Sequence, residues 1–383
     1  MRLGSRLSNL AMSDIRTMTR ACDAVGGINL GQGICDLPTP PAVARGAIDA
    51  IEANRVIYTA AEGIALLREA IRGRIESRYG LAYDPVREIV VTAGATGAFA
   101  AACMALLDPG DEVILFEPYY GYHYNTVVAL GLRPVLVPML PPAWTFDLDA
   151  FDRAVTDRTR AVVVCTPANP SGKVWNTVEL DALADRLERH DLIALTDEIY
   201  EYIVFDDARH VPLATRGTAR ERTVMISGFS KTFAITGWRV GYLTAPAEMA
   251  RRITITNDLL YVCAPTPLQH AMVAGLAMPE TYFSDIAVSY ARKRDILCTA
   301  LVDAGLTPHV PRGAYYVLAD VRRLGHATSR AAAMGILETT GVASVPGTSF
   351  FVDPVGESLV RFCFAKDQDV LHDAARRLRA LPR

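Results

Sequence analysis

Seven short apolar runs follow one another through the middle of the chain, and amphipathic stretches lie between most of them. Each run is continuously apolar, whereas a half-exposed strand would alternate polar and apolar residues, so each predicts a strand covered on both faces. Stretches such as residues 98–107 and 178–190 predict helices. This alternation predicts a doubly wound α/β domain around a mostly parallel sheet. The runs are residues 88–92, 112–116, 134–137, 161–165, 192–196, 224–227 and 240–243.

The pattern changes in the last third of the chain. Helical segments dominate from about residue 247 to residue 304, and short strands follow at residues 313–319 and 359–365, before a final helix at 370–381. This change predicts a second, smaller domain of the α+β class. A length of 383 residues is enough for two or three domains.

Charge and composition argue against several classes of function. The 39 basic and 42 acidic residues nearly balance, and no basic run carries interleaved aromatic residues, so nucleic acid is not an expected partner. No apolar stretch is long enough to cross a bilayer and no secretory signal is evident, so we expect no membrane contact and a cytoplasmic location. Scattered cysteines without a C-x-x-C pair, and histidines without ligand spacing, predict neither a disulfide framework nor a metal site.

Lysine is rare in this chain, which makes each lysine informative. Only Lys173, Lys231, Lys293 and Lys366 occur among the 39 basic residues. The motif around Lys293 predicts a solvated helix face, and Lys173 and Lys366 are consistent with surface positions. Lys231 differs because it follows an apolar strand and Ser230 directly. On this context alone, a reactive amine and a lysine without a role are equal alternatives.

Two neighbouring features could hold a phosphate. Arg239 lies eight residues after Lys231 and offers a bidentate guanidinium, and Ser230 adds a hydroxyl donor. The segment 94–97 lies between a predicted strand and a predicted helix, where free N–H groups and the helix dipole would attract an anion. Any tight turn between a strand and a helix would look similar, so the glycine-containing segment alone does not establish a phosphate site.

Three polar residues follow the predicted strands at their carboxyl ends, where an open α/β sheet binds its ligand. Asp197 is either a helix N-cap or a carboxylate that holds a pyridine nitrogen protonated. Tyr200, three residues later, could project toward a ring hydroxyl. Asn169 could donate to the same hydroxyl, although Asn-Pro-Ser-Gly is equally a plain turn.

Taken together, these motifs resemble the fold-type-I, class I aminotransferases, and the match covers essentially the whole chain. Within that class, the LGQG opening and the RFCFAKD ending look most like the kynurenine/glutamine transaminase and succinyl-diaminopimelate transaminase group. The motifs are residues 29–33 (NLGQG), 58–64 (YTAAEGI), 107–113 (LDPGDEV), 169–172 (NPSG), 197–200 (DEIY), 230–233 (SKTF), 313–316 (GAYY) and 361–364 (RFCF).

The resemblance implies a pyridoxal 5'-phosphate (PLP) cofactor and a site shared by two subunits of a homodimer. Lys231 would hold the aldehyde as a Schiff base and shuttle a proton, while Asp197 would pair with the ring nitrogen. For the ring, Asn169 and Tyr200 would contact the ring oxygen, and Tyr120 would stack on the ring. The phosphate would be bound by the main chain of Ala95 and Thr96, by Ser230 and Arg239, and by Tyr58 from the second subunit. The substrate carboxylate would be bound by Arg361, helped by Asn169 and the main chain near Gly33, and Ile34 would lie near the substrate side chain.

The resemblance also implies a domain division and a reaction. It places part of the small domain in residues 1–40, the large PLP-binding domain in 41–290 and the rest of the small domain in 291–383. The expected reaction moves an amino group between an L-amino acid and a 2-oxo acid by a ping-pong mechanism. Another PLP reaction on the same scaffold, such as β-elimination, decarboxylation or a cyclisation or replacement step, is the alternative. A non-enzymatic regulator is disfavoured because the lysine is present.

Three departures from the family pattern concern the substrate. His123 stands where an aromatic residue is usual, three positions after the stacking tyrosine. The usual Phe-Pro-Asp after LGQG is here Ile34-Cys35-Asp36, and Thr96 stands where some aspartate-specific relatives carry a cation. No clear second cation for a distal carboxylate is apparent, so the amino donor and acceptor stay open.

Overall fold

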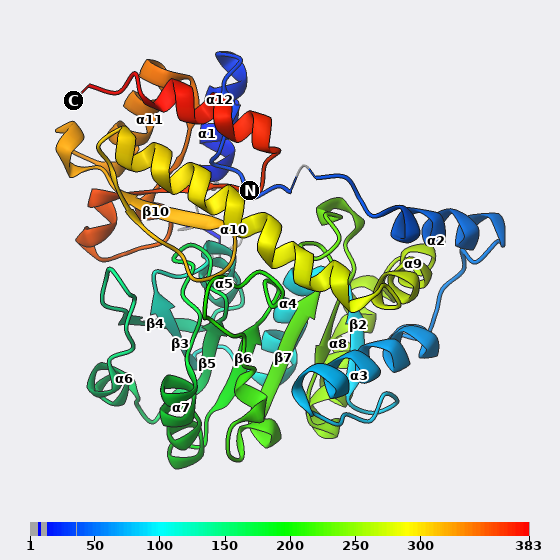
Figure 1. Ribbon diagram of the computed structural model, residues 1–383. Coiled ribbons are helices and arrows are strands. Elements are labelled where there is room, and N and C mark those ends of the chain that lie inside the picture. The colour runs from blue at the N-terminus through cyan, green and yellow to red at the C-terminus, as the bar shows by residue number, and fades with distance from the viewer. Residues whose placement is uncertain (1–6, 9–13, 36, 383) are drawn as a thin grey trace, which may run out of the picture.

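A seven-stranded sheet forms the centre of the larger part of the molecule (Figure 1). The computed structural model describes residues 7–8, 14–35 and 37–382. All neighbouring strands are parallel except β8, which is antiparallel to both β2 and β7. The seven predicted runs are these seven strands, so the mostly parallel α/β sheet is confirmed. In spatial order they are β2 (Ile89–Thr92), β8 (Gly241–Thr244), β7 (Thr223–Gly228), β6 (Ile193–Asp197), β5 (Thr159–Cys165), β3 (Glu112–Glu117) and β4 (Arg133–Pro138).

Helices cover both faces of this sheet, which explains why its strands are continuously apolar. In β3, Val113 and Leu115 belong to the core on one face, and Ile114 and Phe116 belong to the core on the other. Alternate side chains therefore point to opposite faces, and both faces are buried. On the first face lie α4 (Gly94–Leu106), α5 (Gly121–Ala129) and α8 (Ala247–Tyr261); on the second lie α3 (Ala65–Tyr79), α6 (Leu148–Ala154) and α7 (Thr177–Arg189).

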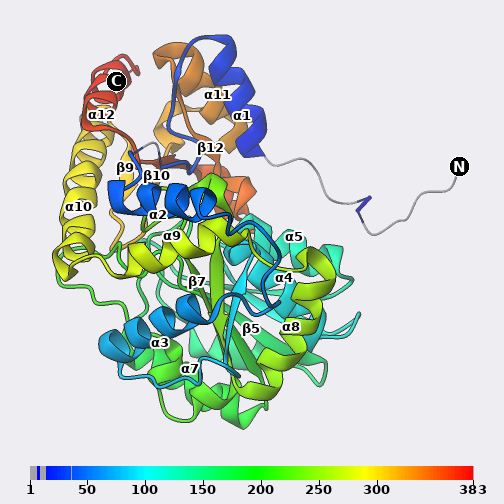
Figure 2. The ribbon, with the colours of Figure 1, turned by 90° about the vertical axis from the view of Figure 1, so that its right-hand side faces the viewer.

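Both ends of the described chain contribute to the smaller part of the molecule. The helix α1 (Asp14–Ala24) lies beside α11 (Ser329–Thr340) in both views (Figures 1 and 2). The strand β1 (Ile28–Asn29) pairs in parallel with β11 (Val342–Ala343). A second, four-stranded sheet has the order β12 (Val345–Pro346), β13 (Leu359–Cys363), β10 (Tyr316–Asp320) and β9 (Thr307–His309), and α12 (Gln368–Leu378) ends the fold.

Three further helices link the two parts. The helix α2 (Pro41–Glu52) packs against α9 (Thr266–Leu276), and α10 (Glu280–Asp303) runs between the larger and smaller parts (Figure 1). Because α10 passes through residue 290 without interruption, the division at 40 and 290 stays a prediction. In the described part of the chain, none of the helices is both long and apolar enough to cross a membrane.

Two lysines lie where the sequence did not place them. Lys293 is only 3% exposed, with its ammonium over the ring of Tyr290, so the predicted solvated position is wrong. Lys173 is also buried, and its ammonium lies 2.6 Å from a carboxylate oxygen of Glu179. The printed partners of both amines lie within six residues in the sequence, but no sequence pattern marked either amine as buried.

Candidate active site

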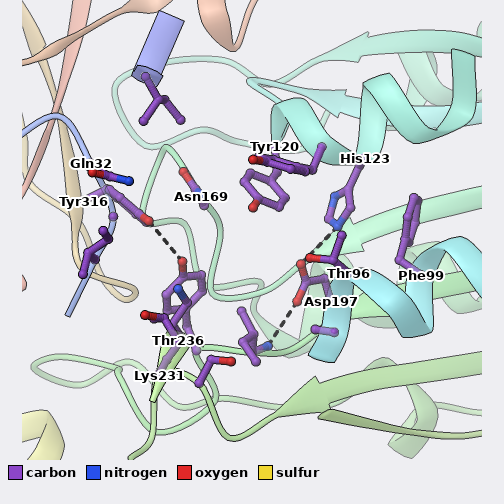
Figure 3. A pocket seen from close by; sticks show the side chains of 18 of the residues that line it. Gln32, Thr96, Phe99, Tyr120, His123, Asn169, Asp197, Lys231, Thr236 and Tyr316 are labelled. Atoms are coloured by element: carbon purple, nitrogen blue, oxygen red, sulfur yellow. Dashed lines mark hydrogen bonds and ion pairs between the residues drawn. The ribbon is translucent and has the colours of Figure 1, made fainter. Parts of the chain in front are cut away.

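The carboxyl ends of β5, β6 and β7 open onto a cavity of about 420 Å³ between the two parts of the molecule (Figure 3). Every predicted site residue except Tyr58 lines it, although residues far apart in the sequence supply them. The predicted residues that meet here are Gly33, Ile34, Ala95, Thr96, Tyr120, Asn169, Asp197, Tyr200, Ser230, Lys231, Arg239 and Arg361. Asp36, which followed Ile34 in the altered motif, lies outside the described residues.

Lys231 enters the cavity from the segment that follows β7. Burial lowers the pKa of its amine from the usual 10.5 to about 8. The thiols of Cys363 and Cys35 and the carboxylate of Asp197 oppose this shift in the pKa, and the nearby charge of Arg239 adds to it. A lysine with this pKa has a much larger neutral, nucleophilic fraction at neutral pH than a lysine in water.

Asp197 faces the cavity at the end of β6, and its two carboxylate oxygens each lie close to one nitrogen atom. One of its oxygens accepts the main-chain N–H of Ile199 at 3.2 Å, and the other lies 3.1 Å from Nε2 of His123. A turn and not a helix follows β6, so the helix N-cap alternative for this residue is wrong; the carboxylate caps that turn and still lines the cavity. These two contacts together hold the carboxylate of Asp197 in one orientation.

His123 is a site residue that the sequence did not reveal. It lies in the first turn of α5, is buried, and stands between the rings of Phe99 and Tyr120 at centroid distances of 4.5 and 5.1 Å (Figure 3). The only available signal was its departure from the family's aromatic residue. Its contact with Asp197 depends on α5 and β6 being brought together by the fold.

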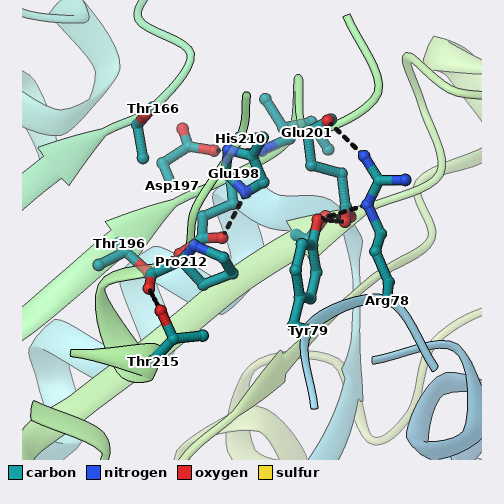
Figure 4. A network of polar contacts seen from close by, with 12 residues as sticks. Arg78, Tyr79, Thr166, Thr196, Asp197, Glu198, Glu201, His210, Pro212 and Thr215 are labelled. Carbon is teal, nitrogen blue, oxygen red and sulfur yellow. Dashed lines mark hydrogen bonds and ion pairs between the residues drawn. The ribbon is translucent and has the colours of Figure 1, made fainter. Parts of the chain in front are cut away.

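A buried polar network fixes the segment that follows Asp197 (Figure 4). Glu198 accepts the hydroxyl of Thr196 at 2.8 Å and lies 2.8 Å from Nε2 of His210. Glu201 accepts the hydroxyl of Ser227, on β7, also at 2.8 Å. Buried carboxylates that are fully hydrogen-bonded hold their backbone rigidly. The network therefore positions Asp197 without entering the cavity.

The start of α4 and Arg239 lie close together and could hold an anion. No side chain caps α4, so its first N–H groups are free to bind an anion. A Cβ on Gly94 would lie 2.6 Å from the guanidinium of Arg239, and one on Gly241 would lie 2.6 Å from the main-chain nitrogen of Ala95. The two glycines thus permit the close approach that places the helix terminus and the guanidinium together.

Arg361 is a buried cation without a carboxylate partner among the described residues. Its side chain is 1% exposed and donates to the side-chain oxygen of Asn169 at 2.9 Å and the carbonyl oxygen of Gly31 at 2.7 Å, while its Nε has no partner. Its guanidinium lies over the ring of Tyr316, 4.2 Å from the centroid. A buried charge without a counter-ion is costly, so this position favours an anionic ligand.

Tyr58 is the predicted site residue that does not reach this cavity. It is 79% exposed, beside the equally exposed Ile57. The cavity is instead completed by residues that the sequence reasoning did not select. They are Ile15, Gln32, Phe99, Tyr122, His123, Thr126, Ile199, Thr236 and Tyr316.

Comparison with known proteins matches this arrangement to one family. The family described as aminotransferase class I and II matches residues 25–378. The chain belongs to this family. The probable N-succinyldiaminopimelate aminotransferase of Mycobacterium tuberculosis is 37% identical over 388 residues and 98% of each chain. The methionine aminotransferase of Escherichia coli is 34% identical over 98% of each chain.

Solved structures of relatives place the fold in the same family. The M. tuberculosis N-succinyldiaminopimelate aminotransferase superposes with a TM-score of 0.96 at 37% identity, over 100% of both chains. The aspartate aminotransferase of Thermus thermophilus with maleate has a TM-score of 0.93 at 32% identity, over 100% of both chains. The aminotransferase described here is therefore an enzyme that transfers amino groups on the fold-type-I scaffold, as the sequence predicted.

Proposed function

We propose that the aminotransferase carries PLP covalently on Lys231 and moves an amino group between an L-amino acid and a 2-oxo acid by a ping-pong mechanism. The observation that carries this proposal is one cavity lined together by Lys231, Asp197, Arg239 and Arg361. These are an amine, a carboxylate and two separate cations, which match the aldehyde, the ring nitrogen, the phosphate and the substrate carboxylate.

The residues present fit this cofactor. The cradle at the start of α4 is narrow enough that a Cβ on Gly94 would collide with Arg239. That cradle would hold the phosphate, with help from Ser230, and Asp197 would hold the ring nitrogen. Tyr200, whose hydroxyl donates to that of Tyr316 at 3.3 Å, would reach the ring oxygen together with Asn169. When bound, PLP supplies an electron sink for the carbanion at the substrate α-carbon.

The side chains perform the remaining steps. Arg361 binds the α-carboxylate through its fork and thereby orients the Cα–H bond. Asn169, whose oxygen accepts from Arg361, fixes that fork. The Nζ of Lys231 would hold the aldehyde of the cofactor at rest and, as a free amine, would accept the proton of the substrate α-carbon and later donate it again. A lysine whose pKa is about 8 suits both directions near neutral pH.

We also propose that two copies of the chain form a homodimer in which Tyr58 reaches the neighbouring site. Supporting this proposal, Ile57 and Tyr58 are 77% and 79% exposed in the single chain, and Leu259, in the last turn of α8, is 81% exposed. The two segments lie side by side, because Asn257 of α8 donates to the carbonyl oxygen of Ala61 at 2.9 Å. Exposed apolar side chains on neighbouring segments are typical of an interaction site. Sedimentation tests this proposal: a single chain with full activity would contradict it.

The experiment for the main proposal measures attachment and stoichiometry. Borohydride reduction of the purified enzyme should fix the cofactor on the peptide containing Lys231, and Lys231→Ala should abolish it. Lys366→Arg, outside the cavity, is the matched control. An amino acid added alone should yield one equivalent of 2-oxo acid per subunit. Continuous product formation without a second 2-oxo acid would contradict transamination and favour a β-lyase.

A further inference from the structure

A second cavity adjoins the active site beside α1. Its volume is about 380 Å³. Three of its lining residues, Ile15, Gln32 and Tyr122, also line the active-site cavity, so the two spaces adjoin and only these side chains stand between them. The other three are Arg16, Thr19 and Arg20, all on α1. A ligand long enough to pass Ile15 and Tyr122 would therefore arrive between arginine side chains.

Each charged group of the active-site cavity, the inner of the two cavities, already has a role in the proposed function. Lys231, Asp197, Arg239 and Arg361 serve the cofactor and the α-carboxylate in the proposed function. The wall that continues toward α1 consists of uncharged side chains, among them Ile15, Ile34, Gln32 and Tyr122. Among the described residues of this chain, a second carboxylate on a short side chain would meet no cation there, which agrees with the absence of a cation at Thr96.

Arg16 and Arg20 are free to bind an anion. They stand one helical turn apart on α1 and therefore project from the same face. Within the described part of the chain, neither guanidinium forms an ion pair or a hydrogen bond. Arg330, by contrast, donates to Asp14 on the same helix. Gln32 is fixed beside the two arginines, because its main-chain N–H donates to the side-chain oxygen of Asn29 at 3.0 Å.

We propose that this outer cavity is a subsite for an anionic group at the far end of the amino-acid substrate. The substrate class is an amino acid with a long uncharged side chain that ends in a carboxylate. The α-carboxylate binds Arg361, the uncharged chain passes Ile15 and Tyr122, and the terminal carboxylate meets Arg16 and Arg20. This inference rests on the proposed function.

Matched pairs of substrates test it. L-2-Aminoheptanedioate and L-2-aminoheptanoate differ only in the terminal carboxylate, and L-glutamate and L-norvaline form the equivalent short pair. The ratio of kcat/KM within each pair, from the half-reaction with the holoenzyme, measures recognition of the terminal charge. We expect a preference for the carboxylate in the long pair only, weakening as ionic strength rises.

The variant Arg16→Gln/Arg20→Gln should lower the ratio in the long pair about tenfold, the effect of losing two exposed charge-assisted hydrogen bonds. Arg376→Gln/Arg379→Gln removes the same charge from exposed positions on or just after α12 and should leave the ratio as it is. An unchanged ratio in the α1 variant, or an equal change in the control, would overturn the subsite. If no amino acid reacts at all, the proposed function fails instead.

Discussion

Lys231 should titrate far below an ordinary lysine in the cofactor-free protein. Its pKa is about 8, against 10.5 for the free side chain, because burial removes water from the ammonium. At pH 7 about one-tenth of the amine is then neutral, against about 0.03% for an ordinary lysine, a difference of about 300-fold. The rate at which this amine attacks an aldehyde or an acylating reagent should rise with this neutral fraction, by less than the full factor because a less basic amine is also a weaker nucleophile.

The small number of lysines makes the assay direct. Competitive acetylation with trace anhydride, followed by separation of the peptides, reports the reactivity of each of the four lysines against pH, with a small reference amine in the same tube. For Lys231 we expect a midpoint near 8. The charge of Arg239 contributes to the lowered pKa, so Arg239→Gln should move the midpoint upward. A midpoint near 10.5 in folded wild-type protein would refute the reasoning.

The same shift has a consequence for stability, with a definite sign. The unfolded chain holds the proton on Lys231 up to pH 10.5, and the folded cofactor-free chain releases it above about 8. Folding is therefore penalised below pH 8, by about 3 kcal/mol, and the penalty disappears as the pH rises to 10.5. Lys231→Met should stabilise the cofactor-free protein at pH 7 by about that amount and by about 2 kcal/mol at pH 9. Urea unfolding at both pH values measures the difference.

Three other changes test the geometry of the site. Arg361→Lys keeps the charge but loses the fork, so kcat/KM for amino acids should fall about 10- to 100-fold in half-reactions. His123→Phe removes a donor from the buried carboxylate of Asp197 and should lower the free energy of unfolding by about 1–3 kcal/mol, with His123→Gln between it and wild type in urea unfolding. Gly241→Ala would place a Cβ 2.6 Å from the backbone at the start of α4. This change should lower the free energy of unfolding by about 1–3 kcal/mol and cause the protein to lose cofactor on dialysis. Gly237→Ala is the control, because a Cβ there meets no atom within 4 Å.

Local sequence patterns are sufficient to predict the strands and the positions of the polar residues that follow them. Continuous apolar runs require cover on both faces, and the residue after each run must stand at the sheet edge, so these patterns alone place Asp197 and Lys231 at one edge of the sheet. Their assignment to PLP depends on the family resemblance, because a carboxylate and an amine at a sheet edge fit many ligands.

The remaining features depend on contacts between distant elements. His123 bonds Asp197 only because α5 lies across the end of β6. The helix α1 reaches the cavity mouth through pairing of β1 with β11, which is more than 300 residues away in sequence. No local pattern marks Ile15 or Arg16 as cavity residues, and none marks Lys293 as buried.

The charged side chains of the active-site cavity differ in how far the fold itself provides them with partners. The carboxylate of the cavity, that of Asp197, has two nitrogen atoms within 3.2 Å of its oxygens, the main-chain nitrogen of Ile199 and Nε2 of His123. The two cations of the cavity, by contrast, bond only neutral groups. Arg361 donates to two neutral oxygens, and Arg239 donates to a carbonyl oxygen at 2.9 Å. In a buried site an excess of positive charge lowers the pKa of a neighbouring amine and favours ligands that bring negative charge. A phosphate would neutralise Arg239 and a carboxylate would neutralise Arg361, whereas the lowered pKa of Lys231 comes mainly from burial, with the charge of Arg239 as a smaller contribution.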